Sequence, residues 1–138
     1  MYSDGLTDEF WAPLRDAVPS FATDWDRFRQ SAGYDVEAPG FNLTRLTRHL
    51  AQRVRDGERD ELAWFGAALE RIVGSVIGND DLLTFLRLDV LESLIMYAEE
   101  FDVAMSVIYA ALGPRTREQW PPAYRWMTGH DWPPAAAS

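Results

Sequence analysis

Two carboxylates, Asp89 and Glu92, interrupt the most apolar stretch of the chain, FLRLDVLESLIMYAEE at residues 85–100. On a straight α-helix with about 100° between residues, most apolar side chains of this stretch, Leu88 among them, cover roughly 200° and predict a core-facing side. The carboxylates fall on the remaining side, where Phe85 and Met96 lie in the middle and are flanked by acids. Apolar side chains ringed by acids are typical of protein-docking surfaces. We therefore expect one exposed partner-binding stripe: Asp81, Phe85, Asp89, Glu92, Met96 and Glu99.

A second interpretation of this stripe stays open at the level of sequence. The N-terminal helices or the C-terminal tail would then cover Phe85 and Met96, and Asp89 and Glu92 would pair with arginines of a neighbouring helix. Arg87 lies among the leucines of the same segment. Its side chain either reaches along the core to water or pairs with a buried acid such as Glu70.

Other residue types that could carry chemistry do not form a recognisable constellation. The two histidines, His49 and His130, have no further ligands at metal-binding spacing, and no glutamate is followed three residues later by histidine. Cysteine is absent, and no glycine-rich phosphate loop occurs. We therefore expect no catalytic residues, no metal, no cofactor and no enzyme. Residues 42–59 are arginine-rich, and ion pairs with the acidic helices are favoured there over a phosphate or RNA site.

The elements that must hold the stripe are helical throughout. No alternating strand pattern occurs, and Leu62, Phe65, Leu69, Ile72 and Val76 follow the 3-4 spacing of an amphipathic helix. Capping residues, glycines and prolines delimit the segments. The expected helices are 7–18, 20–32, 42–56, 58–77, 80–98, 102–112 and a short one from residue 116.

This pattern predicts an all-α fold, a single-domain helical bundle of about six or seven helices. Residues 68–72 and 90–94 resemble each other, so stacked antiparallel helix pairs are a second possible arrangement. The 138 residues are enough for one domain. We divide it into N-terminal helices and a loop (1–41), core helices (42–113) and a short helix with a tail rich in proline and tryptophan (114–138).

The net charge of −9 argues against nucleic acid and anionic membranes as partners. It is compatible with a cationic protein. The N-terminus shows no signal-peptide pattern, and no apolar run is long enough to span a membrane. We expect a cytoplasmic protein, of undetermined oligomeric state, that contacts neither membranes nor nucleic acid.

Residues 60–120 resemble a family of small, all-helical, uncharacterised bacterial proteins that includes candidate immunity proteins of polymorphic toxin systems. The resemblance lies in residues 85–97, in two Leu-Glu pairs, and in a Leu-Gly-Pro motif followed by tryptophan. In this sequence these are Leu69-Glu70, Leu91-Glu92, Leu112-Gly113-Pro114 and Trp120. The resemblance implies no catalytic residues. With the acidic stripe, it predicts an immunity-type protein that neutralises a cationic toxin domain; the alternatives are a helical scaffold or accessory subunit, or a non-catalytic protein of another kind.

Overall fold

The structure, a computed structural model, describes residues 10, 12–30 and 39–133 of the chain. Every regular element in these ranges is a helix, which confirms the predicted all-α bundle. Residues 12–16 are also helical. The elements are the 3₁₀ helix η1 (Pro19–Phe21), α2 (Ala22–Arg29), α3 (Pro39–Arg55), α4 (Asp60–Ser75), α5 (Asp80–Phe85), the π-helix η2 (Leu86–Leu91), α6 (Glu92–Glu100), α7 (Met105–Ala110) and α8 (Pro114–Thr128).

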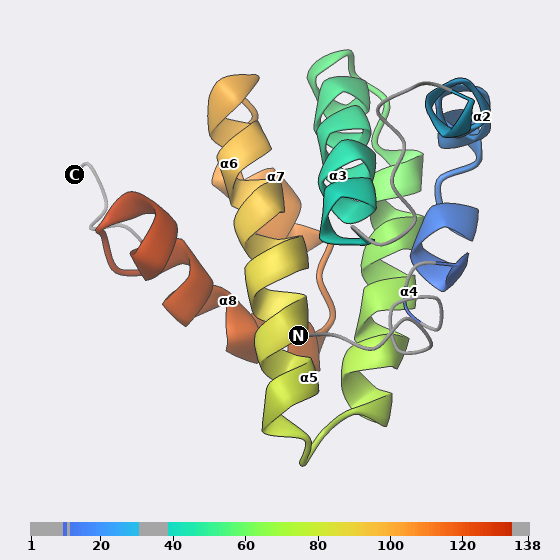
Figure 1. The fold of residues 1–138 in the computed structure, drawn as a ribbon. Coiled ribbons are helices and arrows are strands. Elements are labelled where there is room, and N and C mark those ends of the chain that lie inside the picture. The colour runs from blue at the N-terminus through green and yellow to red at the C-terminus, as the bar shows by residue number, and fades with distance from the viewer. Residues whose placement is uncertain (1–9, 11, 31–38, 134–138) are drawn as a thin grey trace.

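A continuous rod formed by α5, η2 and α6 runs through the middle of the molecule, with α3 and α4 on one side and α8 on the other (Figure 1). Helix α3 packs against η2 and α6, and α8 packs against η2, α6 and α4. The predicted stripe of α4 and its continuation, from Leu62 to Val76, is buried. Among the described residues, no helix is long and apolar enough to cross a membrane.

The turn between α4 and α5 follows the sequence signals. Gly78 has a φ of +92°, a left-handed conformation that glycine adopts without a steric penalty. The side chain of Asn79 caps α5, because its Oδ1 accepts a hydrogen bond from the Leu82 N–H at 3.2 Å. The rod therefore begins where the sequence predicts and runs back antiparallel to α4 (Figure 1).

Among the helix boundaries that differ from the expected ones, two have a clear physical reason. Helix α3 begins at Pro39 instead of residue 42, because proline fits the first helical turn, where its missing N–H has no partner to lose. Asp102, expected to open the next helix, instead ends α6 in a left-handed conformation with a φ of 57°. The Val103 N–H then bonds the Ala98 carbonyl at 2.8 Å and closes the last turn. The expected start of the first helix, at residue 7, lies outside the described ranges.

Helix α8 is longer than the expected short helix with an irregular tail. It runs to Thr128 with Pro121 and Pro122 inside it. Both prolines are exposed, while Trp120 is fully buried. The core contacts of the opposite face hold the helix together although two backbone donors are missing. Beyond α8, the Trp132 ring returns to pack against Trp120, at 5.5 Å between centroids.

Glu70 of α4 caps the N-terminus of α8, and it lies 45 positions before Arg115 in the sequence. Its carboxylate accepts hydrogen bonds from the backbone N–H groups of Arg115 (3.1 Å) and Thr116 (2.9 Å) and from the Thr116 hydroxyl (2.8 Å). Burial acts to raise the pKa of Glu70, but these bonds and Arg115 outweigh it, so the pKa is lowered. Glu70 is therefore engaged by α8 and does not pair with Arg87.

Small residues on the same face of α4 let the following chain approach closely. A Cβ atom on Gly66 would lie 2.0 Å from the backbone oxygen of Ala111. A Cβ on Gly74 would lie 2.4 Å from Nη1 of Arg115, which is the end of a flexible side chain. Gly66, Glu70 and Gly74 are spaced by four residues and thus form one strip that seats the end of α7 and the start of α8.

The Glu70→Gln variant tests the cap. It replaces one acceptor oxygen by an amide that faces the Arg115 N–H, and we expect a loss of about 1.5–3 kcal/mol in the free energy of unfolding at neutral pH. Because the folded-state pKa is lowered, the stabilisation is present above the ordinary value of 4.5 and is lost as pH falls through the folded value. Urea unfolding at neutral pH and at a pH below the folded-state pKa of Glu70 measures this loss of stability. The exposed Glu118→Gln is the control, and equal stability of the two variants would contradict the cap.

A matched pair of glycine substitutions tests the strip. Alanine at either position gains about 1 kcal/mol of helix propensity. At Gly66 the methyl group meets backbone, so α4 must move away, and we expect a net destabilisation of about 1–3 kcal/mol. At Gly74 only the Arg115 side chain must shift, so Gly74→Ala is expected to be neutral or stabilising. Thermal unfolding of both variants decides this, and shifts of the same sign and size would overturn it.

Candidate functional site

An open groove of about 240 Å³ lies where α3, the central rod and α8 meet. Leu88 and Met96 form part of its wall and are each 40% exposed, which is high for large apolar side chains. Two carboxylates share the groove with them. The lining residues are Thr44, Leu88, Asp89, Glu92, Ser93, Met96 and Met127.

The π-helix η2 places these side chains. The Glu92 N–H bonds the Arg87 carbonyl five residues earlier, so one extra residue is accommodated relative to an α-helix. Side chains beyond η2 are thereby rotated by about 100° from their positions on a straight helix. Leu88 lies within the π segment itself, where straight-helix positions do not apply, and it faces the groove instead of the expected core.

Buried hydroxyl groups hold the end of the π segment against α3. Thr47 donates a hydrogen bond to the Ser93 hydroxyl at 2.9 Å, and both residues are buried. The Ser93 hydroxyl in turn lies 2.9 Å from the Asp89 carbonyl and 3.0 Å from the Val90 carbonyl. At a π turn the regular α-helical hydrogen bonds are interrupted, and some carbonyls lose their N–H partner. The Ser93 hydroxyl supplies a hydrogen bond to such carbonyls.

The two groove carboxylates differ in their electrostatic surroundings. Burial alone raises the pKa of Asp89, and its Oδ2 atom is buried with no hydrogen-bond partner. Burial also raises the pKa of Glu92, with Arg87 opposing and Asp89 adding to the effect. Neither carboxylate forms an ion pair within the described ranges. Within the described residues, Asp89 is therefore the groove carboxylate whose pKa no cation is shown to lower.

The prediction that Phe85 is exposed is wrong. Its side chain is fully buried and its ring stacks on that of Phe10, with 5.7 Å between centroids. The straight-helix assumption failed because Phe85 precedes the π turn and Met96 follows it, so the two no longer share a face. The open interpretation that N-terminal residues cover the stripe thus holds for Phe85 and not for Met96.

Three members of the predicted stripe, Asp89, Glu92 and Met96, do meet in the groove. Asp81 and Glu99 are exposed but lie outside its lining. Leu88 and Met127 were not predicted as site residues. The π turn that exposes Leu88 leaves no signal in the apolar pattern, and Met127 required a helix that continues through two prolines.

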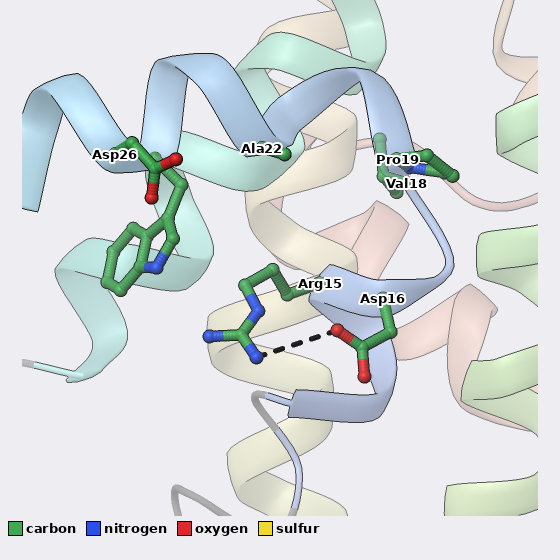
Figure 2. A pocket seen from close by; sticks show the side chains of 7 residues that line it. Arg15, Asp16, Val18, Pro19, Ala22 and Asp26 are labelled. Carbon is green, nitrogen blue, oxygen red and sulfur yellow. Dashed lines mark ion pairs between the residues drawn. The ribbon is translucent and has the colours of Figure 1, made fainter.

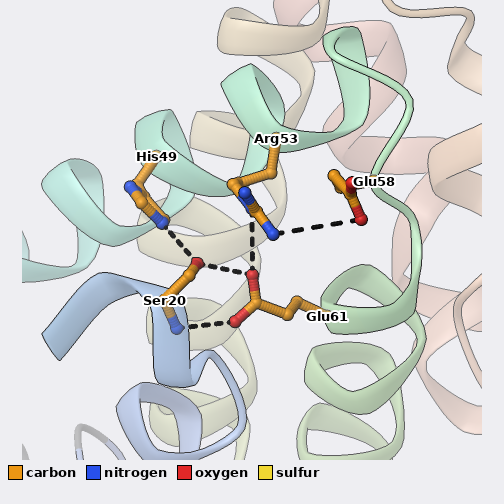
Figure 3. Close-up of polar contacts among 5 residues, drawn as sticks. All are labelled: Ser20, His49, Arg53, Glu58 and Glu61. Atoms are coloured by element: carbon orange, nitrogen blue, oxygen red, sulfur yellow. Dashed lines mark hydrogen bonds and ion pairs between the residues drawn. The ribbon is translucent and has the colours of Figure 1, made fainter.

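A second polar cluster joins η1 to α3 and α4 (Figure 3). Glu61 accepts hydrogen bonds from the Ser20 N–H (2.8 Å), the Ser20 hydroxyl (2.5 Å) and Arg53 (3.2 Å). His49 Nε2 lies 2.8 Å from the same hydroxyl. The carboxylate contacts the serine and not the imidazole, which differs from the serine–histidine–acid order of a hydrolase. The cluster fastens the N-terminal helices to the bundle.

The charges of this cluster agree with that structural role. Burial is the main cause that lowers the pKa of His49, and the positive charge of Arg53 lowers it further. The negative charges of Asp24 and Glu61 act in the opposite direction. Burial would raise the pKa of Glu61, but the bonds from Ser20 and Arg53 prevail and lower it. Arg53 thus forms the ion pair that the sequence favoured for the arginine-rich segment. No sequence signal links Ser20 to Glu61, which are 41 positions apart.

A hollow of about 400 Å³ lies between residues 12–16 and α2 (Figure 2). Arg15 and Asp16 project into this region and pair at 3.5 Å, and Asp26 adds another negative charge. The hollow therefore mixes charges of both signs, already paired in part. It gives no clear preference for a ligand of one kind, whereas the groove combines apolar walls with charge of a single sign.

Comparison of the chain with protein-family models, with curated proteins and with solved structures finds no match. The resemblance noted in the sequence therefore stays a hypothesis.

The Asp89→Asn variant tests the electrostatics of the groove. Because the folded-state pKa of Asp89 is raised, the folded protein holds this proton more tightly than the unfolded chain. The carboxyl therefore lowers stability at neutral pH and not below its ordinary pKa of 3.8. We expect the variant to gain about 1 kcal/mol at neutral pH, with the gain vanishing in acid.

Urea unfolding across this pH range gives the measurement. Asp81→Asn, at an exposed position outside the groove, is the matched control and should change little. A loss of stability for Asp89→Asn at neutral pH would mean that the carboxylate has a favourable partner in the folded protein, contrary to its described surroundings.

Proposed function

We propose that this protein is a cytoplasmic, immunity-type binding protein that captures and neutralises a cationic protein partner, such as a toxin domain. The groove between the central rod and α8 is the binding site in this proposal. The observation that carries it is the combination of exposed apolar side chains, Leu88 and Met96, with two acids that form no ion pair with any described residue. Apolar contact would supply affinity, and the acids would select a basic partner.

The overall charge supports the same partner chemistry. At −9, the chain attracts cationic proteins over a distance and repels polyanions. Rapid capture matters for neutralising a toxic enzyme, because damage accumulates until the complex forms. Electrostatic attraction raises association rates in this way.

The resemblance in the sequence supports the immunity role in part. Glu70 of the first Leu-Glu pair caps α8, so its presence is explained by folding. Glu92 of the second pair lines the groove and takes no part in a cap or an ion pair of the described chain. Of the two acidic motif residues, Glu92 is thus the one available to a partner.

Co-expression with the protein encoded by the adjacent gene tests the proposal. We expect that protein to arrest growth alone and the wild-type chain to restore growth and to co-purify with it. A neighbour that is neither toxic nor bound would refute the proposal. Size-exclusion chromatography with light scattering tests the scaffold alternative, which predicts an obligate oligomer with the groove inside the interface.

Matched substitutions place the binding site. Met96→Arg introduces a positive charge in the groove, and we expect affinity for the cationic partner to fall by about 100-fold or more, since like charges at an interface cost several kcal/mol. Ile77→Arg adds the same charge at another exposed apolar position, 58% exposed and outside the groove, and should bind normally. Titration calorimetry measures both. Equal affinities would move the binding site elsewhere on the surface.

A further inference from the structure

We propose that the groove receives an arginine side chain of the partner, whose guanidinium group binds the carboxylate of Asp89. This inference rests on the proposed function, which it deepens by naming the group that is recognised. It is carried by the uncompensated carboxylate, the apolar walls and the size of the groove.

The Asp89 carboxylate has acceptor capacity that no described residue uses. Its Oδ2 atom has no hydrogen-bond partner and is out of contact with water. The nearby hydroxyls of Thr47 and Ser93 bond each other and main-chain carbonyls of residues 44, 89 and 90, so they do not solvate this carboxylate. Rotation about the Cβ–Cγ bond exchanges the two oxygens, so a donor in the groove can reach either.

Among the described residues, no basic group forms an ion pair with this carboxylate. Arg87 lowers the pKa of Glu92, whereas burial is the cause of the raised pKa of Asp89. The lining contributed by α3 and α8, Thr44 and Met127, carries no charge. A buried acceptor of this kind gains most from a charged donor, because charge-assisted hydrogen bonds are the strongest in proteins.

The walls of the groove favour arginine over lysine. Leu88, Met96 and Met127 surround the acids with apolar and polarisable surface. A guanidinium group is planar and weakly hydrated, so it loses little on leaving water and can lie flat against such side chains. Its N–H donors also spread over a fixed plane, whereas an ammonium group is compact and strongly hydrated.

The volume of the groove, about 240 Å³, fits a side chain better than a cofactor. Pockets for small-molecule ligands usually enclose about 300–1,000 Å³ and bury most of the ligand. The π turn that shapes the groove agrees with a role in binding. Such turns strain the helical hydrogen-bond pattern and occur frequently at functional sites.

Peptide binding observed at the methionine methyl groups tests the inference on the full chain. The probe is a capped peptide with one arginine between leucines, compared with otherwise identical peptides that contain lysine or uncharged citrulline. We expect the arginine peptide to shift the NMR signals of Met96 and Met127. Met105, which packs against the core on α7, is an internal reference and should not move.

Affinity should fall about ten-fold or more with citrulline, or in Asp89→Asn, as expected for a charge-assisted hydrogen bond. Asp81→Asn should bind as the wild type does. Equal binding of the citrulline peptide, or unchanged binding by Asp89→Asn, would overturn the proposal; equal binding of the lysine peptide would overturn the choice of guanidinium.

This result is separable from that of the co-expression test. If the neighbouring protein fails to bind while the arginine peptide binds through Asp89, the partner assignment is wrong and the groove chemistry stands. If the neighbour binds Asp89→Asn as tightly as the wild type, the arginine anchor is wrong and the binding function stands.

Discussion

The single π turn in the central rod decides which side chains face the core and which face the groove. An extra residue between the Arg87 carbonyl and the Glu92 N–H changes the helical phase between α5 and α6. Phe85, before the turn, packs on Phe10 inside the molecule. Leu88, Asp89 and Met96 come to the open side. The hydrogen bond from Thr47 to Ser93 fastens this arrangement to α3.

The second wall of the groove depends on interactions far from it. Glu70 holds the N-terminus of α8 through three hydrogen bonds, and the close approach at Gly66 seats the preceding chain. Helix α8 then extends through its exposed prolines, with Trp120 anchored in the core. Its last turn brings Met127 to the groove. The seven residues that line the groove thus depend on the Glu70 cap and on the close approach at Gly66, although neither Glu70 nor Gly66 is part of the lining.

The fold was largely predictable because helical periodicity, caps and glycine signals are local. The buried stripe of α4, the Asn79 cap and the absence of strands in the described ranges all follow from short-range patterns. The length of α8 does not follow from short-range patterns, because two consecutive prolines normally end a helix. Here the tertiary contacts of Trp120 and Tyr124 override them.

The site was only partly predictable because its geometry depends on helical phase. The sequence correctly placed three residues together on the exposed side: Asp89, Glu92 and Met96. All three lie at or beyond the middle of the π segment. Phe85 was misplaced, and Leu88 was assigned to the core, because a straight helix was assumed across residues 86–91. The rod is covered on most sides, so its apolar pattern fits a straight α-helix as well as a helix with a π turn. The pattern therefore does not reveal the extra residue. Contacts between distant segments bring Ser20 and Glu61 into the polar cluster and Met127 into the groove. A single sequence shows no pattern from which such contacts can be predicted.

Because the chain contains no cysteine, single-cysteine labelling tests the phase of the central rod directly. Cysteine is placed in turn at Leu88, Met96 and Phe85, and the rate of reaction with a water-soluble thiol reagent is measured for each folded variant. The account predicts fast labelling at Leu88 and Met96 and strong protection at Phe85. Labelling of Phe85→Cys as fast as that of Met96→Cys, with protection at Leu88, is the behaviour of an uninterrupted α-helix and would contradict the π turn and the groove that it forms.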